Sequence, residues 1–216
     1  MQLCEQYRPK KWTEVVGQDK ALAQIEAVKK RGLGGRAYFI SGQSGTGKTT
    51  IAKLLAAEIA SDLYINEIDA TTITPARLSD IEYEMSMYGW GKGGKAYIFN
   101  EAHGLSRPAM RQLLVLLERL PKHVMVIFTT TCENAVDMFE QKLDASPLLS
   151  RCQEINLSRR DLAQPFAQRA RDIAILEGLK NGQPIEEYVK LVRKHKNNMR
   201  AVLQAIEAGA MAESGA

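Results

Sequence analysis

Residues 42–49 have the types and the spacing that could hold a chain of phosphate groups. They read Gly-Gln-Ser-Gly-Thr-Gly-Lys-Thr and match the P-loop pattern GxxxxGK[ST] at every fixed position. Glycines let the backbone curl with its N–H groups inward, and the start of the following helix adds a positive partial charge. Lys48 would reach the β- and γ-phosphates, and the Thr49 hydroxyl would be a ligand of Mg²⁺. The phosphate-binding residues predicted here are Gly42, Ser44, Gly45, Thr46, Gly47, Lys48, Thr49 and Thr50.

A second pair of polar residues, Asn100 and Glu101, follows the apolar residues 95–99. In P-loop enzymes the strand at this place carries an aspartate that holds the water shell of Mg²⁺ and, in one large class, a glutamate that activates water. Glu101 suits the second role, whereas Asn100 occupies the aspartate position. A neutral amide still accepts a hydrogen bond from a metal-bound water, but it attracts Mg²⁺ less than a carboxylate does. We therefore expect ATP binding with lowered Mg²⁺ affinity and turnover; the alternative is that both residues only cap the strand.

The phosphate loop and the pair at residues 100 and 101 must be positioned by strands and helices. Along the sequence, short apolar segments alternate with helical patterns. Strands are predicted at residues 37–41, 63–68, 95–99, 124–130 and 153–157. Helices are predicted between them at residues 49–61, 75–87, 107–120 and 134–142. Ser106 is the expected N-cap of the third of these helices, and Pro108 suits its first turn. The alternation implies βαβ units and a parallel sheet, with the phosphate loop between a strand and a helix, as its chemistry requires.

Strand signals stop after residue 157, and the rest of the sequence predicts helices only, at residues 158–178, 184–196 and 199–210. We therefore expect a P-loop domain at residues 1–157 and a small helical domain at residues 158–216. Between residues 158 and 200 the chain carries ten Lys and Arg against five Asp and Glu. This excess fits either a solvated helical surface or a face for nucleic acid.

The overall composition excludes several classes of protein. The 216 residues are 45% hydrophobic and 25% charged, which is typical of a globular chain and excludes a disordered or fibrous one. Aromatic residues are only 6%, which disfavours an aromatic platform for nucleic acid, and the net charge of +4 permits an anionic partner. Three scattered cysteines without a CxxC pattern argue against a disulfide framework and favour a reducing compartment. We expect neither a secretory signal nor a membrane partner, because no early apolar region and no long apolar run is present.

Four motifs follow one another along the chain. They are Tyr7-Arg8-Pro9-Lys10 with Val15-Val16-Gly17-Gln18, the phosphate loop, Asn100-Glu101-Ala102-His103 and Ser150-Arg151-Cys152. Together they resemble the clamp-loader ATPases of the AAA+ class, from about residue 7 to about residue 200. The resemblance implies an α/β fold, in which an AAA+ P-loop domain with a five-stranded parallel sheet flanked by helices precedes a small all-helical lid.

The resemblance also implies roles outside the phosphate loop. Glu101 would polarise the attacking water, and Thr130 would contact the γ-phosphate or that water. Arg200 would reach the same nucleotide from the lid, and Arg151 would act in trans as an arginine finger on the ATP of a neighbouring subunit. The alternatives are ordinary structural roles. Thr130 would then be a strand-end threonine, Arg200 a solvent-facing arginine and Arg151 a partner in a salt bridge. The residues implied near the adenine and ribose are Tyr7, Arg8, Val16 and Gly17.

The implied function is that of an ATPase module of a sliding-clamp loader in DNA replication. Its cofactors would be ATP and Mg²⁺, the metal being held by Thr49 and, through a water, by Asn100. Its partners would be other loader subunits, the sliding clamp and primer–template DNA contacted through phosphates, with Arg77 and Arg107 as candidate contacts. Its compartment would be the cytoplasm of a bacterial, archaeal or phage-infected cell, or a eukaryotic nucleus.

Departures from the family pattern favour some alternatives. Asn100 favours a hydrolysis-poor scaffold subunit that only binds nucleotide. Because no cysteine lies between Thr50 and Asn100, the chain is expected to be more similar to the zinc-free loader subunits of archaea, eukaryotes or phages than to bacterial gamma and tau subunits. The family's helical collar would follow the lid, yet the sequence ends at Ala216, as in a truncated chain or a compact relative. An AAA+ branch-migration motor begins similarly, but Ser150-Arg151-Cys152 disfavours it.

Overall fold

The computed structural model describes residues 1–131, 146–179 and 183–211. Contacts divide the chain into two units. We call Lys20–Gln43 with Lys48–Leu157 the sheet unit, and Met1–Asp19 with Ser44–Gly47 and Ser158–Ala216 the helical unit. The two units part at residues 157 and 158, but the N-terminal segment and the tip of the phosphate loop group with the C-terminal helices. The division into domains at residues 1–157 and 158–216 stays a prediction.

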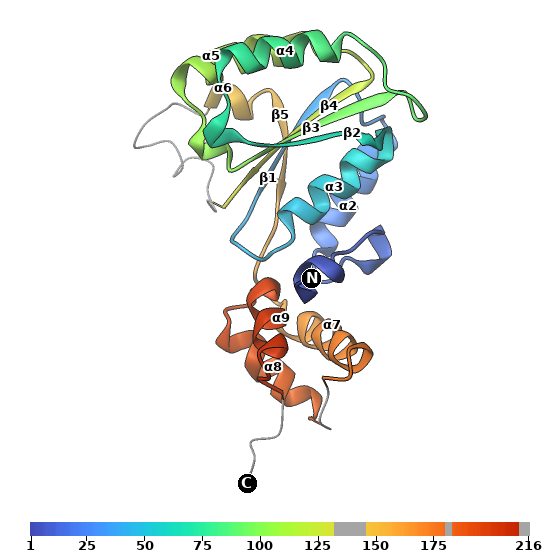
Figure 1. Ribbon diagram of the computed structural model, residues 1–216, viewed down its shortest axis with the longest axis vertical. Coiled ribbons are helices and arrows are strands. Elements are labelled where there is room, and N and C mark those ends of the chain that lie inside the picture. Colours follow the sequence, from blue (N-terminus) through green and yellow to red (C-terminus); the bar gives the residue numbers. More distant parts are fainter. Residues whose placement is uncertain (132–145, 180–182, 212–216) are drawn as a thin grey trace. The chain divides into compact units, whose positions relative to one another are not determined.

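The sheet unit contains the predicted five-stranded parallel sheet (Figure 1). Its strand order is β2-β3-β4-β1-β5, and every pairing is parallel. Residues of the central strands are almost all buried, as expected for a parallel sheet with helices on both faces. The strands are β1 (Arg36–Ser41), β2 (Ala60–Asp69), β3 (Gly94–Asn100), β4 (Val124–Thr130) and β5 (Cys152–Asn156).

Helices cover the sheet in two layers. Figure 1 shows α4 (Pro75–Met85) and α5 (Arg107–Glu118) on one side, and α2 (Asp19–Lys29) and α3 (Lys48–Ile59) on the other. Apolar residues of α4 and α5 cluster with buried side chains of the strands in one hydrophobic core. The predicted caps of α5 are confirmed, since Ser106 accepts a hydrogen bond from the Ala109 N–H at 3.4 Å and Pro108 lies in the first turn.

Some helix bounds differ from the prediction. The predicted helix at 49–61 ends at Ile59 because β2 already begins at Ala60. Helix α2 was not predicted, although its buried residues Ala21, Ile25 and Val28 have helical spacing. The short α6 (Ser146–Leu149) was also missed, and the predicted helix at residues 134–142 lies outside the described residues.

The helical unit has its own core, built from α7 (Ala163–Leu176), α8 (Ile185–Lys194), α9 (Met199–Glu207) and the N-terminal α1 (Leu3–Gln6). The predicted helix at 158–178 is wrong over its first five residues. Ser158 Oγ accepts a hydrogen bond from the Arg160 N–H at 2.9 Å, and Asp161 has a left-handed φ of 58°. The helix predicted at residues 184–196 begins one residue later, at Ile185, and Pro184 is its N-cap. In the part of the chain that the structure describes, no helix combines the length and the apolar character that crossing a membrane demands.

We expect the free energy of unfolding to depend strongly on the aromatic packing in the sheet. The ring of Phe128 on β4 stacks on Phe99 at 5.5 Å between centroids and lies 6.4 Å from Phe39. Phe128→Ala should lower that free energy by about 3–5 kcal/mol, because it would leave a large cavity in the core that the sheet forms with α4 and α5. Val115→Ala, at a position 52% exposed, is the control and should stay within about 0.5 kcal/mol of the unmodified protein. Equal effects in urea titrations would contradict this account.

Candidate functional site

The phosphate loop leaves β1 and enters α3 through a backbone that glycine alone adopts easily. Gly42, Gly45 and Gly47 have φ angles of 148°, 78° and 100°. Lys48 is only 7% exposed, and its ammonium donates to the carbonyl oxygens of Gly42 at 2.8 Å and Gln43 at 3.0 Å. These two bonds hold the ammonium group against the start of the loop. The loop therefore has the backbone shape and the buried cation that binding a phosphate chain requires.

Strand register gathers the other predicted residues of the sheet unit near this loop. Ser41, which ends β1, lies opposite Thr130, which ends β4. The next strand, β3, pairs with β4 and ends at Asn100. The loop, Thr130 and Asn100 thus follow or end three neighbouring parallel strands at their carboxyl ends, which is where ligands bind in open α/β sheets.

Glu101 follows β3 in a conformation that is unusual for a residue with a side chain. Its φ and ψ are both 53°, in the left-handed region. Its carboxylate accepts a hydrogen bond from Thr131 Oγ1 at 3.2 Å and lies 3.3 Å from Nδ1 of His103. Backbone strain of this kind clusters at functional sites. The two contacts hold the carboxylate at the end of the sheet, and His103 is a local partner of Glu101.

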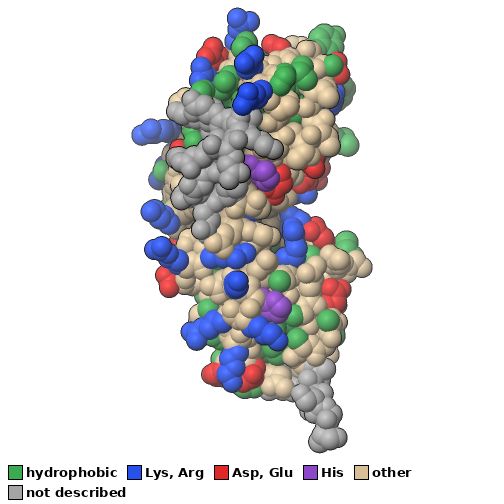
Figure 2. All heavy atoms as spheres, turned by 90° about the vertical axis from the view of Figure 1, so that its left-hand side faces the viewer, with side chains coloured by type: hydrophobic (Ala, Val, Ile, Leu, Met, Phe, Trp, Pro, Cys, Tyr) green, Lys and Arg blue, Asp and Glu red, His purple; other side chains and the backbone are tan. Residues whose placement is uncertain are grey.

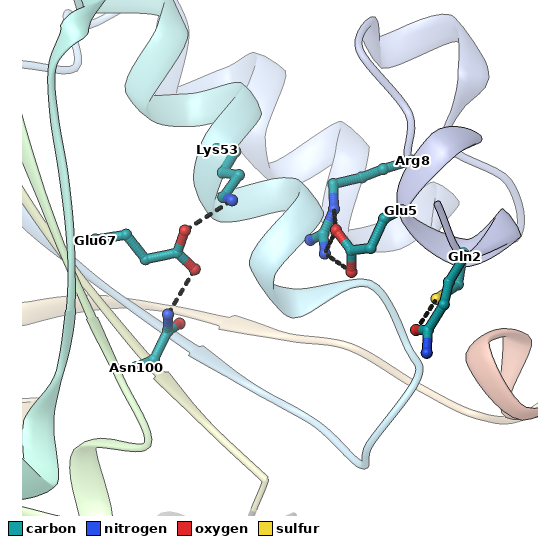
Figure 3. Close-up of polar contacts among 7 residues, drawn as sticks. Gln2, Glu5, Arg8, Lys53, Glu67 and Asn100 are labelled. Atoms are coloured by element: carbon teal, nitrogen blue, oxygen red, sulfur yellow. Dashed lines mark hydrogen bonds and ion pairs between the residues drawn. The ribbon is translucent and has the colours of Figure 1, made fainter.

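Asn100 is held at both ends of its amide. Its Nδ2 donates to Glu67 Oε1 at 2.7 Å, and its Oδ1 accepts from Thr129 Oγ1 at 2.8 Å. Glu67 in turn forms an ion pair with Lys53 at 2.7 Å (Figure 3). Sequence reasoning missed Glu67, Lys53 and Thr129. The order of the strands in the sheet, which no local pattern specifies, brings Glu67 beside Asn100.

Within the helical unit, two residues that were given no role, Gln18 and Arg159, donate hydrogen bonds to the tip of the phosphate loop, and a third, Asn198, lies close to Gly45. Gln18 Nε2 donates to the Thr46 carbonyl at 3.4 Å, and the Arg159 guanidinium donates to the Ser44 carbonyl. Asn198 caps α9 by accepting from the Ala201 N–H at 3.2 Å. A Cβ on Gly45 would lie only 1.9 Å from Oδ1 of Asn198, so this position also requires glycine for space.

Gln18 also binds the backbone of residue 158. The side chain is 4% exposed, donates to the Ser158 carbonyl at 2.9 Å and accepts from the Ser158 N–H at 3.3 Å. It therefore ties the N-terminal segment to the first residue of the C-terminal part. The signal in the sequence that could have indicated this role is the glutamine directly after Gly17, in a motif whose other residues were assigned to nucleotide binding.

The residues implied near adenine and ribose all lie in the helical unit. The Tyr7 hydroxyl donates to Glu177 Oε1 at 2.5 Å, and this bond raises the pKa of the Tyr7 phenol above its usual range. The Arg8 guanidinium pairs with the Glu5 carboxylate at 2.5 Å (Figure 3). Val16 packs against the core of the helical unit. Gly17 has a φ of 73°, and a Cβ there would lie 2.5 Å from Leu162 Cδ2.

Arg151, the implied finger, is engaged within its own chain. Its Nε donates to Glu118 Oε1 at 3.2 Å, and its Nη1 donates to the Pro147 carbonyl at 2.9 Å. Beside it, burial raises the pKa of the Cys152 thiol to about 12, so this cysteine is a packing residue and not a nucleophile. Arg200, the implied second sensor, is an exposed residue in the first turn of α9.

The residues present fit ATP and Mg²⁺. Within the described ranges, no group of three or more His, Cys, Asp and Glu could hold a metal ion by itself. A P-loop site does not need one, because Mg²⁺ there takes a hydroxyl, phosphate oxygens and waters. Thr49 in the first turn of α3 can supply the hydroxyl, and the free lone pair of the Asn100 oxygen can accept from a metal-bound water.

Comparison with known proteins also indicates a P-loop domain. A family model described as the TIP49 P-loop domain matches residues 3–87. The DNA polymerase III subunit tau of Escherichia coli is 31% identical over 185 residues, covering 75% of this chain and 28% of that protein. The DNA polymerase III subunit tau/gamma of Haemophilus influenzae is 28% identical over 238 residues, covering 96% of this chain and 32% of that protein. This chain is an AAA+ P-loop domain related to the clamp-loader subunits.

Solved structures of other proteins have the same fold as this AAA+ domain. The Thermotoga maritima RuvB Holliday junction branch migration motor superposes with a TM-score of 0.70 at 20% identity, covering 93% of this chain and 64% of that one. A point mutant of the same Thermotoga maritima RuvB gives a TM-score of 0.75 at 19% identity, with the same coverage of both chains. At this identity the likeness shows the fold alone.

The same comparisons bear on the length of the relatives and on the expected branch of the family. The AAA+ domain spans about a third of the length of these curated relatives, at 28% and 32%. The relatives named here are bacterial gamma and tau subunits, so the expected preference for zinc-free archaeal, eukaryotic or phage subunits is not supported. The missing cysteines between Thr50 and Asn100 are therefore a poor guide to the branch of the family.

We expect Gly17 to be essential for packing the N-terminal motif. Gly17→Ala should lower the free energy of unfolding by about 1 kcal/mol through its positive φ and by a further 1–3 kcal/mol, roughly, through the contact with the buried Leu162. Gly32→Ala is the matched control, since Gly32 has a φ of 84° but nothing within 4 Å of its Cβ position. Urea titrations of both variants compare the two effects. Equal losses would mean that the contact with Leu162 contributes nothing.

Proposed function

We propose that this AAA+ domain binds ATP with Mg²⁺ and is the ATPase module of a sliding-clamp loader that acts in DNA replication in the cytoplasm. The observation that carries the proposal is the complete phosphate loop at the carboxyl end of β1, with its lysine buried, in a chain related to DNA polymerase III tau subunits. Because those relatives are about three times longer, the activity and the partners of the whole protein are part of the proposal.

Different residues of the chain would bind the different parts of the nucleotide. The N–H groups of residues 44–47, with Lys48, Thr49 and Thr50, would hold the phosphates, and Thr49 and Asn100 would hold Mg²⁺ and its water. Bound Mg²⁺ neutralises charge on the β- and γ-phosphate oxygens. The N-terminal residues Tyr7, Arg8, Val16 and Gly17 would contact the adenine and ribose.

The remaining residues would act on the γ-phosphate. Glu101 would accept a hydrogen bond from the attacking water, since its carboxylate is already oriented by Thr131. Thr130 and Arg200 would contact the γ-phosphate or that water. Arg151 would leave Glu118 and reach the ATP of a neighbouring subunit, where such a finger is worth roughly 10³–10⁵ in rate.

Primer–template DNA would be contacted through its phosphates. Figure 2 shows Lys and Arg side chains spread over one face of the helical unit. The two candidates in the sheet unit are both exposed, Arg77 near the start of α4, where it pairs with Glu84 at 2.8 Å, and Arg107 at the start of α5. The exposed basic residues of the helical unit include Arg160, Lys190, Arg193, Lys194, Lys196 and Arg200.

A second candidate function is a nucleotide-binding scaffold with little hydrolysis. The observation that favours it is the neutral amide of Asn100 in place of the usual carboxylate, with both of its ends engaged by Glu67 and Thr129. A branch-migration motor has no such support, because the likeness to RuvB extends to the fold alone.

Steady-state Mg²⁺-ATPase, titrated against protein concentration with and without primer–template DNA, separates these functions. We expect turnover to rise more than linearly with concentration and further with DNA, because Arg151 acts on a neighbour. Arg151→Ala should lower turnover by roughly 10³ without weakening ATP binding, whereas Lys48→Ala should abolish binding. No turnover by the unmodified protein, with activity appearing in Asn100→Asp, would favour the scaffold. Failure to bind ATP would contradict both functions.

Binding of primer–template DNA should weaken steeply as salt rises, because each phosphate contact releases counterions. Arg107→Ala should reduce the slope of log affinity against log salt by about one. Val115→Ala, at an exposed and uncharged position of the same helix, is the control, and its slope should be unchanged. Fluorescence anisotropy over a range of salt concentrations measures the slopes. Salt-insensitive binding would count against phosphate contact.

A further inference from the structure

A chain of polar contacts crosses four elements of the sheet unit near the carboxyl ends of the strands. Lys53 of α3 pairs with Glu67 of β2 at 2.7 Å, and Glu67 accepts from the Asn100 amide of β3 at 2.7 Å. The other end of that amide accepts from Thr129 of β4 at 2.8 Å. Figure 3 shows Lys53 and Asn100 pointing at the Glu67 carboxylate from either side. The contacts therefore link the helix that follows the phosphate loop to β4.

The chemistry of these groups sets the direction of the Asn100 amide. An ionised carboxylate only accepts hydrogen bonds, so the Asn100 atom that faces Glu67 must be the NH₂ group. The amide oxygen then faces away from β2 and receives the Thr129 hydroxyl. A carbonyl oxygen has two lone pairs, so one remains after this bond. Without Glu67, the amide could turn over and present a donor where an acceptor is needed.

We propose that Glu67, itself held by Lys53, is the positioning residue that fixes the Asn100 amide with its oxygen as the acceptor at this place in the site. The role of that oxygen, to accept from a Mg²⁺-bound water, rests on the proposed function. The orientation of the amide does not, because it follows from the contacts among Glu67, Asn100 and Thr129 alone.

The proposal makes the effect of Glu67 depend on the residue at position 100. With asparagine there, the Glu67 carboxylate receives a hydrogen bond. With aspartate there, two carboxylates would face each other at hydrogen-bond distance, and like charges repel. Lys53 would offset only part of this repulsion, because its side chain is 43% exposed and screened by water. Neutralising Glu67 should therefore destabilise the unmodified protein and stabilise Asn100→Asp.

A double-mutant cycle tests this reversal without any nucleotide. The free energy of unfolding is measured in urea for the unmodified protein, Glu67→Gln, Asn100→Asp and the double variant. In the asparagine background, Glu67→Gln should raise the unfolding equilibrium constant by about threefold. In the aspartate background it should lower that constant by about threefold, because a glutamine can donate to the new carboxylate. Equal effects of Glu67→Gln in the two backgrounds would overturn the proposal.

Glu58→Gln is the matched control for this cycle. Glu58 lies in a comparable ion pair, 2.9 Å from Lys29, and its side chain is 31% exposed against 36% for Glu67. Its removal should change the unfolding constant by the same factor in both backgrounds. A reversal of sign with Glu58→Gln as well would mean that net charge, and not the Glu67–Asn100 contact, causes the effect, and would overturn the proposal.

Calorimetric titration with ATP distinguishes positioning from a general structural role. Glu67→Gln should weaken ATP binding in Mg²⁺ by about threefold, the effect of one water-mediated contact, and leave binding in EDTA unchanged. Equal weakening in Mg²⁺ and EDTA would overturn the positioning role. If no ATP binds under either condition, the proposed function fails, while the unfolding cycle still decides whether Glu67 orients Asn100.

Discussion

The parallel pairing of β1 with β4, and of β4 with β3, is the constraint on which the rest of the structure depends. It brings three strand ends to one edge of the sheet, and each carries a different chemical group: a curled backbone with a buried ammonium, a threonine, and an amide followed by a carboxylate. A slip of one residue in either pairing would turn every side chain to the opposite face. The aromatic packing of Phe39, Phe99 and Phe128 opposes such a slip, so the core that stabilises the sheet also sets the alignment of the site.

The N-terminal motif has a structural role beside the proposed one in nucleotide binding. Tyr7 contacts Glu177 of the region after α7, Gly17 lies against Leu162, and Gln18 bonds to both residue 158 and residue 46. These contacts join three stretches of sequence that are far apart in the chain. The motif therefore helps to shape the loop tip before any ligand is considered.

The sequence was sufficient for the features that depend on local patterns. Apolar segments predicted the strands, Ser106 and Pro108 predicted the start of α5, and the glycine spacing predicted the phosphate loop. Features that depend on distant partners were missed. Glu67 lies beside Asn100 because β2 and β3 are neighbours in the sheet, and Arg151 contacts Glu118 across 33 positions of sequence. The helix predicted from residue 158 was wrong at its start because Ser158 and Asp161 form a turn, which the helical pattern of the following residues concealed.

At Glu101, which has a left-handed backbone, selection for stability and selection for the carboxylate favour different residues. A residue with a side chain is less stable there than glycine by about 1 kcal/mol, so Glu101→Gly would relax the chain. The same exchange would remove the carboxylate that Thr131 and His103 hold at the end of β3. Directed evolution that rewards only heat resistance or yield would thus drift toward loss of this carboxylate. A library built to improve the protein should leave position 101 unvaried, or it will return well-folded molecules that lack this carboxylate.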